Sequence, residues 1–162
     1  MQTKKIDIRW TDLDPNRHVS NSSLLDYMSH ARVSMLEDEG IGQDDFAKHK
    51  LGPIVFHEHI YYFREALPGG SLYVSIDLKG LSKDGSFFEF EQNIYDEAGN
   101  NLVGYDIIGG WMDLKTRKIT SRPEEVMKKF DGIERSADFR ELTKTDTRAQ
   151  NKKPKPVDPK QF

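Results

Sequence analysis

The chain has 162 residues, a formal net charge of −3 from 24 basic and 27 acidic side chains, and no cysteine. This length suits one domain with a substantial core, and the balanced charge gives no field that would attract nucleic acid or a membrane surface. Without cysteine, disulfides, thiolate nucleophiles and cysteine-ligated metals are excluded. The N-terminal residues lack the apolar run of a signal peptide, and no stretch is long enough to span a membrane. We therefore expect a cytoplasmic protein.

The first predicted element is a strand over residues 3–10, in which apolar and polar side chains alternate. From Ser22 the apolar residues follow steps of three and four, which predicts a helix of about five turns that ends at Gly40. Glycine at this position favours the termination of a helix. Asn21, Ser22 and Ser23 mark its start, because all three are favourable N-cap residues. No other long helix is predicted.

Residues 52–114 then contain several strand-like segments that are separated by turn signals. Their ranges are 52–67, 71–82, 86–97 and 101–114. The pair Asp84-Gly85 between two of them is a strong hairpin signal, and successive hairpins of this kind predict an antiparallel meander. Three glycines within the last segment, from Gly104 to Gly110, predict a bulge or the close approach of another backbone.

After these strands, residues 122–130 favour a short helix with Pro123 near its start. Residues 135–162 carry several lysines and prolines but few apolar side chains, which predicts a disordered tail because little burial offsets the entropy of ordering. The folded domain is therefore expected to span residues 1–134. One long helix must bury its apolar stripe, so we predict an α+β fold in which an antiparallel sheet of about five strands wraps around one central helix.

The polar stretch between the first strand and the helix contains two carboxylates, Asp12 and Asp14. Aspartate is common in turns, so both side chains could simply solvate the loop. Asp14, however, lies a few residues before the helix, where unpaired backbone N–H groups and the positive end of the helix dipole attract negative charge. A carboxylate that attacks or activates water, together with N–H groups that stabilise an oxyanion, provides the parts required for acyl transfer.

Three histidines are further candidates. His18 in the same loop is a candidate acid or base because imidazole titrates near neutral pH, although a lone loop histidine more often packs or caps. His57 and His59 share one face of a predicted strand and could in principle hold a metal. No further ligand with suitable spacing accompanies them, so we expect no metal site and assign them to an exposed or partner-facing side of the strand. Phosphate-binding glycine loops and nucleophilic serine elbows do not occur in the sequence.

The segment Arg9–Gly40 resembles the opening segment of hotdog-fold acyl-CoA thioesterases of the 4-hydroxybenzoyl-CoA thioesterase type. That family reads D-x-D-x-x-G-H-V-N-N-x-x-Y, followed by a helix that contains A-R and ends in glycine. The matching residues here are Asp12, Asp14, His18, Val19, Asn21, Ala31, Arg32 and Gly40. Residues 52–74 also resemble the second and third strands of the family. The resemblance covers roughly residues 4–114 and implies the hotdog fold, an antiparallel five-stranded sheet wrapped around one long central helix.

The resemblance also implies an activity, the hydrolysis of an acyl thioester of coenzyme A or of acyl carrier protein (ACP). Asp14 would be the catalytic carboxylate, either as nucleophile or as general base on water. Asn21 would orient the water or the substrate. Backbone N–H groups of Ser22, Ser23 and Leu24 would bind the thioester carbonyl at the start of the helix.

The family assembles as dimers or pairs of dimers, with active sites between protomers. The resemblance therefore implies a homo-oligomer in which Val55, His57 and His59 line the site of the neighbouring subunit. It implies no metal or organic cofactor, because coenzyme A or ACP is part of the substrate. Three residues depart from the family pattern, and the first is Ser20, which replaces the first of the paired asparagines. The other two concern substrate binding. Arg17 replaces the usual glycine, where it could bind a coenzyme phosphate or fill the pocket, and Leu24 replaces the usual tyrosine.

Two other functions stay open at this point. A hotdog protein that binds an acyl or coenzyme-A-like ligand without catalysis would also carry these residues. A hydratase or dehydratase would need a proton-transferring group beside the substrate, for which His18 is the nearby candidate. Acyl chain length, the choice between coenzyme A and ACP, and the choice between dimer and tetramer are not encoded in any motif.

Overall fold

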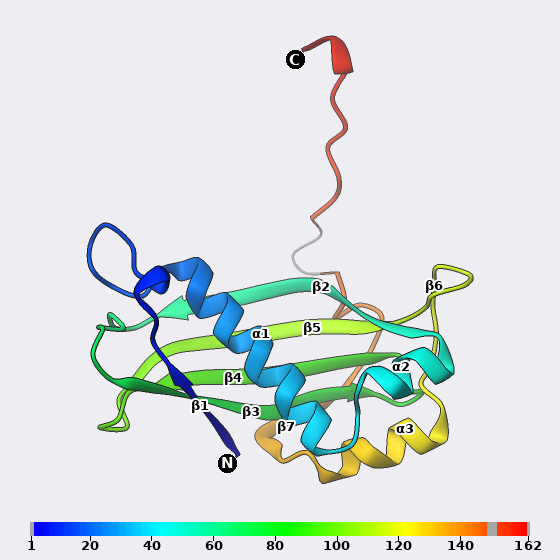
Figure 1. The fold of residues 1–162 in the computed structure, drawn as a ribbon. Helices are drawn as coiled ribbons and strands as arrows, with labels where there is room; N and C mark the ends of the chain where they lie inside the picture. Colours follow the sequence, from blue (N-terminus) through cyan, green and yellow to red (C-terminus); the bar gives the residue numbers. More distant parts are fainter. Residues whose placement is uncertain (1, 149–151, 162) are drawn as a thin grey trace.

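The computed structural model describes residues 2–148 and 152–161, and one long helix lies across one face of a curled sheet (Figure 1). The helices are α1 (Asn21–Asp38), α2 (Gln43–His49) and α3 (Glu124–Lys129), with 3-10 turns at Trp10–Asp12, Phe130–Gly132 and Pro159–Gln161. The strands are β1 (Thr3–Asp7), β2 (Leu51–Tyr62), β3 (Ser71–Ser82), β4 (Phe87–Tyr95), β5 (Asn101–Asp113), β6 (Lys118–Ile119) and β7 (Arg135–Leu142). Among the helices of these residues, none has the length and apolar character needed to cross a membrane.

The predicted long helix is confirmed as α1, but its cap differs from the expected one. The N-cap is Ser20, whose Oγ accepts a hydrogen bond from the Ser23 N–H at 3.2 Å, so the three residues after it do not cap the helix. The helix ends just before Gly40, which adopts a left-handed φ of +74° as the sequence predicts. Each large apolar side chain that α1 buries against the sheet contributes about 1.5–3 kcal/mol. The buried residues are Leu24, Tyr27, Met28, Ala31 and Met35.

The five predicted strands form an antiparallel sheet in the order β1-β3-β4-β5-β2. The predicted meander is therefore confirmed for β3, β4 and β5 but wrong for β2, which pairs with β5 at the far edge. In the chain, α1 and α2 separate β1 from β2, and these two strands lie at opposite ends of the five-strand order. Residues 63–70 then cross the end of the sheet to reach β3 (Figure 1).

Gly109 on β5 shows why this strand carries glycines. A side chain there would place its Cβ 2.5 Å from the carbonyl oxygen of Ile54, and β2 is bulged between Val55 and His57 opposite this position. Only glycine leaves room for so close a backbone. The prediction of a bulge or close approach is thus confirmed.

Besides the two-residue strand β6, one helix and one strand are not predicted by the sequence. The first is α2, whose seven residues are too few to establish a helical period. The second is β7, which lies in residues 135–162, the predicted disordered tail. That prediction is wrong for Arg135–Leu142, whereas residues 149–151 and 162 lie outside the described residues, so the tail prediction cannot be compared there.

The fold explains why β7 is ordered despite its polar composition. β1 pairs with β3 only from Ser71 to Ser75, which leaves the rest of that strand edge open. β7 occupies the open part, in parallel, and buries Leu142 against Gly80. Backbone pairing and one buried leucine therefore hold a segment whose composition alone predicts disorder.

Candidate active site

Asp12 anchors the loop that leads from β1 to α1. The residue is only 3% exposed and accepts hydrogen bonds from the backbone N–H of Arg9 at 2.8 Å, from its guanidinium at 2.9 and 3.1 Å, and from the hydroxyl of Tyr27. These bonds, foremost those of Arg9, hold the pKa of Asp12 at about 2, below its usual value of 3.8. Because both carboxylate oxygens are engaged, Asp12 has a structural role and is not free for chemistry.

Asp14 is held in a tight turn of the same loop. Its Oδ1 accepts hydrogen bonds from the backbone N–H groups of Asn16 at 2.8 Å and His18 at 3.2 Å. Its own N–H donates to the carbonyl of His18, and its carbonyl accepts from the N–H of Arg17, both at 2.9 Å. Within the described residues no hydrogen bond engages Oδ2. One oxygen therefore orients the carboxylate, and the other is free to react.

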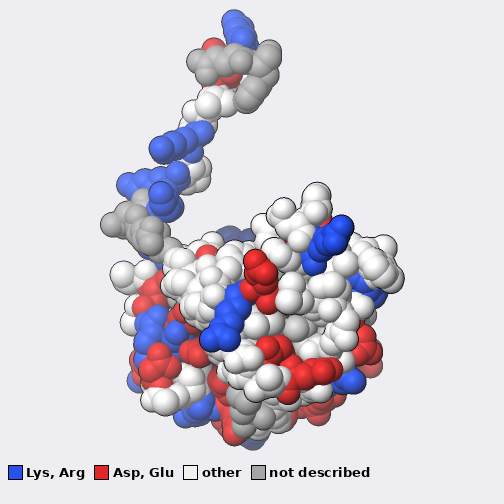
Figure 2. Space-filling view, turned by 90° about the vertical axis from the view of Figure 1, so that its left-hand side faces the viewer, with Lys and Arg blue, Asp and Glu red and all other residues white. Residues whose placement is uncertain are grey.

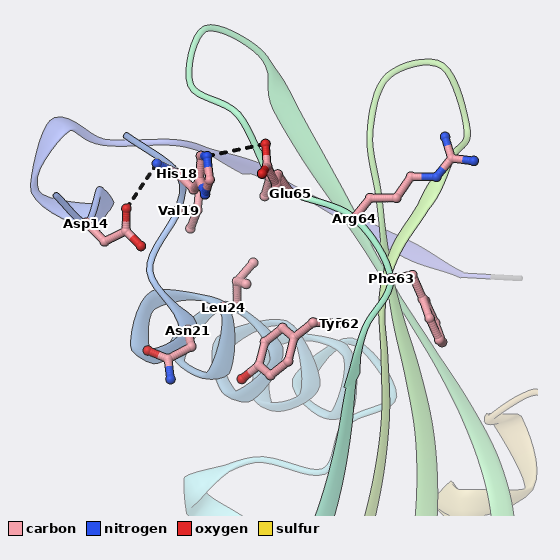
Figure 3. A pocket seen from close by; sticks show the side chains of 10 residues that line it. Asp14, His18, Val19, Asn21, Leu24, Tyr62, Phe63, Arg64 and Glu65 are labelled. Atoms are coloured by element: carbon pink, nitrogen blue, oxygen red, sulfur yellow. Dashed lines mark hydrogen bonds and ion pairs between the residues drawn. The ribbon is translucent and has the colours of Figure 1, made fainter. Parts of the chain in front are cut away.

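A cavity of about 380 Å³ lies beside Asp14, between this loop, the start of α1 and the segment that follows β2 (Figure 3). Four of the predicted site residues line it, namely Asp14, His18, Asn21 and Leu24. The other lining residues are Val19, Tyr62, Phe63, Arg64, Glu65 and Ala66. The structure thus brings the predicted carboxylate, the loop histidine and the first turn of the helix to one cavity.

The first turn of α1 offers fewer free N–H groups than the resemblance implies. The N–H of Ser23 donates to Ser20 Oγ at 3.2 Å, and that of Leu24 donates to the Ser20 carbonyl at 3.0 Å. The N–H of Ser22 lies 3.0 Å from the side-chain oxygen of Asn21. Ser20 and Asn21 thus engage these three N–H groups within the chain, and their binding of a thioester carbonyl stays a prediction. In this turn of the described chain, the N–H of Asn21 is the free donor, and neither Ser22 nor Ser23 lines the cavity.

Arg17 stands where the family carries glycine, and it adopts a glycine-like backbone. Its φ of +66° lies in the left-handed region, which costs a residue with a Cβ on the order of 1 kcal/mol. Its side chain is exposed and does not line the cavity. Arg17 therefore does not fill this cavity, and its other predicted role, the binding of a coenzyme phosphate, stays a prediction.

The three β2 residues predicted to bind substrate do not meet Asp14 within one chain, because none of them lines the cavity. Val55 points to the face that α1 covers, beside Phe90 and Leu36. His57 and His59 lie on the opposite face, where His57 Nε2 is 3.0 Å from the backbone carbonyl oxygen of Asp146. Their contribution to the site of a neighbouring subunit stays a prediction.

Residues 62–66 form the second wall of the cavity, which the sequence analysis missed. Glu65 looks like an ordinary strand end in the sequence, but its Oε2 lies 3.3 Å from His18 Nε2. A backbone bond joins the two walls, since the Val19 N–H donates to the carbonyl of Ala66 at 2.8 Å. No local pattern marks this contact, because the two segments are far apart in the sequence and meet only through the crossing of residues 63–70.

Acidic and basic side chains are interspersed on the side of the molecule that carries the loop (Figure 2). This view shows no extended field of one sign that would concentrate an anionic substrate. Arg64 lines the cavity but turns its guanidinium outward, where it lies 3.4 Å from the side-chain oxygen of Asn100 (Figure 3).

A separate group of side chains has the spacing of metal ligands. Donor atoms of Asp45, His49 and Glu125 all lie within 4.8 Å of one another. Lys129 contacts Asp45 at 2.6 Å, and Lys48 contacts Glu125 at 2.7 Å. Because two ammonium groups already pair with the two carboxylates, we interpret this group as an ion network that joins α2 to α3.

One long helix wrapped by a curled antiparallel sheet is the hotdog fold, which is the fold of a class of thioester hydrolases. A comparison with family models agrees. Residues 8–130 match the thioesterase-like superfamily, and the chain belongs to that family. The resemblance noted from the sequence is thus confirmed. No protein of curated function matches the sequence significantly.

Several solved structures share the fold. YbaW, a probable thioesterase of Escherichia coli, is 25% identical, with a TM-score of 0.71 over 82% of this chain and 98% of that chain. Slr0204, a 1,4-dihydroxy-2-naphthoyl-CoA thioesterase of Synechocystis, is 18% identical, with a TM-score of 0.72 over 80% and 95% of the two chains. A thioesterase of Thermus thermophilus, solved with coenzyme A and zinc, is 24% identical, with a TM-score of 0.65 over 78% and 94%.

Proposed function

We propose that the protein hydrolyses acyl thioesters of coenzyme A or ACP in the cavity beside Asp14. The observation that supports the proposal is the hydrogen bonding of the two oxygens of the Asp14 carboxylate. Two backbone N–H groups hold Oδ1, whereas Oδ2 has no partner among the described residues, and the side chain lines the cavity. A carboxylate oriented in this way can act on a carbonyl carbon placed beside it.

The chemistry can follow either of two routes. As a nucleophile, Asp14 Oδ2 adds to the thioester carbon, the C–S bond breaks, and water then cleaves the resulting acyl anhydride. As a general base, Asp14 takes a proton from water while the hydroxide adds to the same carbon and the thiolate leaves. In both routes the carbonyl oxygen gains negative charge. The free N–H of Asn21, at the positive end of α1, is the donor available to stabilise it.

The substrate class follows from the family and from one neighbour. The thioesterase structure from Thermus thermophilus contains coenzyme A, which supports a coenzyme A thioester as the substrate here. Leu24 would contribute an apolar wall to the acyl site, and Arg17 would offer an exposed cation to a phosphate of the carrier. A cytoplasmic location stays a prediction from the sequence.

Activity against a panel of acyl thioesters tests the proposal. The purified chain is incubated with straight, branched and aromatic acyl groups carried by coenzyme A or ACP, and released thiol is measured. We expect release from at least one class, and the same acyl group on both carriers decides between them. Tight binding of acyl-CoA without thiol release would contradict hydrolysis and favour a binding protein. A change in enoyl absorbance without thiol release would instead favour a hydratase.

We also propose that two chains associate through β2. This strand pairs with β5 and with no other strand of the described residues. It also exposes apolar side chains, with Val55 52% and Tyr61 51% exposed. A long edge strand with unpaired backbone groups and exposed apolar side chains favours pairing with another chain. Such a dimer would bring Val55, His57 and His59 of one chain toward the neighbouring subunit.

A double substitution on β2 tests this assembly. Val55→Glu with Tyr61→Glu is expected to convert the dimer to a monomer, because pairing would bury four additional carboxylates, two per chain. Sedimentation measures the mass of each protein. Trp10→Glu is the control, since Trp10 is 90% exposed and lies outside β2. The wild type and the control should have the mass of two chains or of a pair of dimers, and a monomeric wild type would contradict the proposal.

A further inference from the structure

We propose that Glu65 positions His18 as the proton donor to the sulfur that leaves during thioester hydrolysis. This inference rests on the proposed function and adds to it a residue that no sequence motif marks. The pair joins the two walls of the cavity, with His18 Nε2 3.3 Å from Glu65 Oε2 (Figure 3).

The position of His18 relative to Asp14 is fixed by the backbone. The His18 N–H donates to Asp14 Oδ1 at 3.2 Å, and the His18 carbonyl accepts the Asp14 N–H at 2.9 Å. These reciprocal bonds hold the carboxylate and the imidazole in one turn, on the same side of the cavity (Figure 3). A substrate that reaches Asp14 therefore also lies close to His18.

Glu65 is fixed on the opposite wall by a second backbone contact. The Val19 N–H donates to the carbonyl of Ala66 at 2.8 Å, and Ala66 is buried. The residues on either side of this bond, His18 and Glu65, are thereby brought side by side. The contact between Nε2 and the Glu65 carboxylate limits rotation of the imidazole.

Among the residues that line the cavity, His18 is best suited to donate a proton near neutral pH. The other ionisable side chains there are Asp14, Glu65, Tyr62 and Arg64. Carboxylates are ionised at this pH, while phenol and guanidinium groups normally release protons only at much higher pH. The His18 side chain is 29% exposed and that of Glu65 64% exposed, so the imidazole can also exchange protons with solvent.

The proposed step balances as follows. The C–S bond breaks, its electron pair leaves with the sulfur, and the sulfur takes the proton from the imidazolium of His18, which becomes neutral. Water supplies the oxygen that completes the carboxylic acid and, directly or through Asp14, the proton that recharges the imidazole. The products are a carboxylic acid and a thiol, and no other reactant is needed. Donation matters most for an alkyl thiol, whose pKa of about 8.5 makes its thiolate a poorer leaving group than that of an aryl thiol.

Two thioesters of the same acyl group separate proton donation from a structural effect. His18→Gln should lower kcat on the alkyl thioester by roughly 10²-fold and on the aryl thioester by less than about 3-fold. Glu65→Gln should also lower kcat more on the alkyl thioester than on the aryl thioester. The fall on the alkyl thioester should be smaller than for His18→Gln, roughly 3- to 10-fold, because the imidazole is present but its orientation is less restricted. Glu65→Asp should restore part of the alkyl activity, since it keeps the negative charge.

Glu124→Gln is the matched control, because this exposed glutamate on α3 pairs with Lys128 and lies outside the cavity. Thermal unfolding shows whether each variant is folded. Equal losses on both thioesters, or no loss on either, would overturn the role of the pair while leaving the proposed hydrolysis intact. A wild-type chain that releases no thiol from either thioester would instead overturn the proposed function and this inference with it.

Discussion

Asp14→Asn is expected to lower kcat for thioester hydrolysis by roughly 10²- to 10⁴-fold while leaving the fold unchanged. The side-chain oxygen of asparagine can still accept the two hydrogen bonds that Oδ1 receives from Asn16 and His18. The turn is therefore retained, and the substitution removes the negative charge and the reactive oxygen. Released thiol measured under saturating substrate gives kcat, and binding of a non-hydrolysable acyl-CoA analogue shows whether the cavity is intact.

The matched control for this substitution is Asp26→Asn, which changes a carboxylate on α1 outside the cavity. It removes the same charge from a nearby part of the chain and should leave kcat within about 2-fold of the wild type, as expected for surface sites. If Asp14→Asn is as active as this control, then Asp14 is not the catalytic carboxylate. The chain would still belong to the thioesterase-like superfamily, but another group would have to act as the nucleophile or general base.

Asp12→Ala is expected to lower the free energy of unfolding by about 2–3 kcal/mol, because it leaves the buried hydroxyl of Tyr27 and the donors of Arg9 without their charged acceptor. The effect should depend on pH. The pKa of Asp12 is lowered to about 2 in the folded chain, so its contribution is complete above pH values of about 4 and is lost as the pH falls toward 2.

Urea unfolding at pH values of about 6 and about 3 measures both effects. The difference in unfolding free energy between the wild type and Asp12→Ala should be large at the higher pH and smaller at the lower one, where the wild type begins to lose the same interaction. Asp26→Asn serves again as the control, and its difference in unfolding free energy from the wild type should not become smaller at the lower pH. A difference that is constant or that widens with falling pH would contradict the assignment of Asp12 as the ionised anchor of the loop.

The parts of the fold that the sequence predicts are those encoded by local patterns. The period of the apolar residues from Leu24 to Met35 is enough for α1, and the glycine at position 109 reflects a close backbone contact that no other residue would allow. The pairing of β2 with β5 could not be predicted in this way, because hairpin signals describe only neighbours in the chain. β7 was missed for a related reason, since its stability comes from an open strand edge elsewhere in the sheet.

In the candidate site, too, the sequence predicts the residues of a local motif but not the contacts between distant segments. Asp14, His18 and Asn21 belong to one continuous motif, and the structure brings them to one cavity. Glu65 has no motif of its own and reaches His18 only because residues 63–70 cross the end of the sheet. Which N–H groups are free at the start of α1 could not be predicted either, because this depends on which residue caps the helix, and several neighbouring residues are suitable caps.

The two edges of the sheet are not equivalent, and this difference limits how the protein can associate. β1 and β7 together cover most of the outer edge of β3, whereas β2 has no strand beyond it within the described residues. Open-ended polymerisation through sheet edges needs two free edges, one to present and one to receive. The edge opposite β2 is divided between two short strands, β1 and β7, which run in opposite directions along β3. β2, with 12 residues, is therefore the long continuous edge of the described sheet. An isologous pair, β2 against β2, uses the long edge of both chains and leaves only the short strands at the outside of the joined sheet.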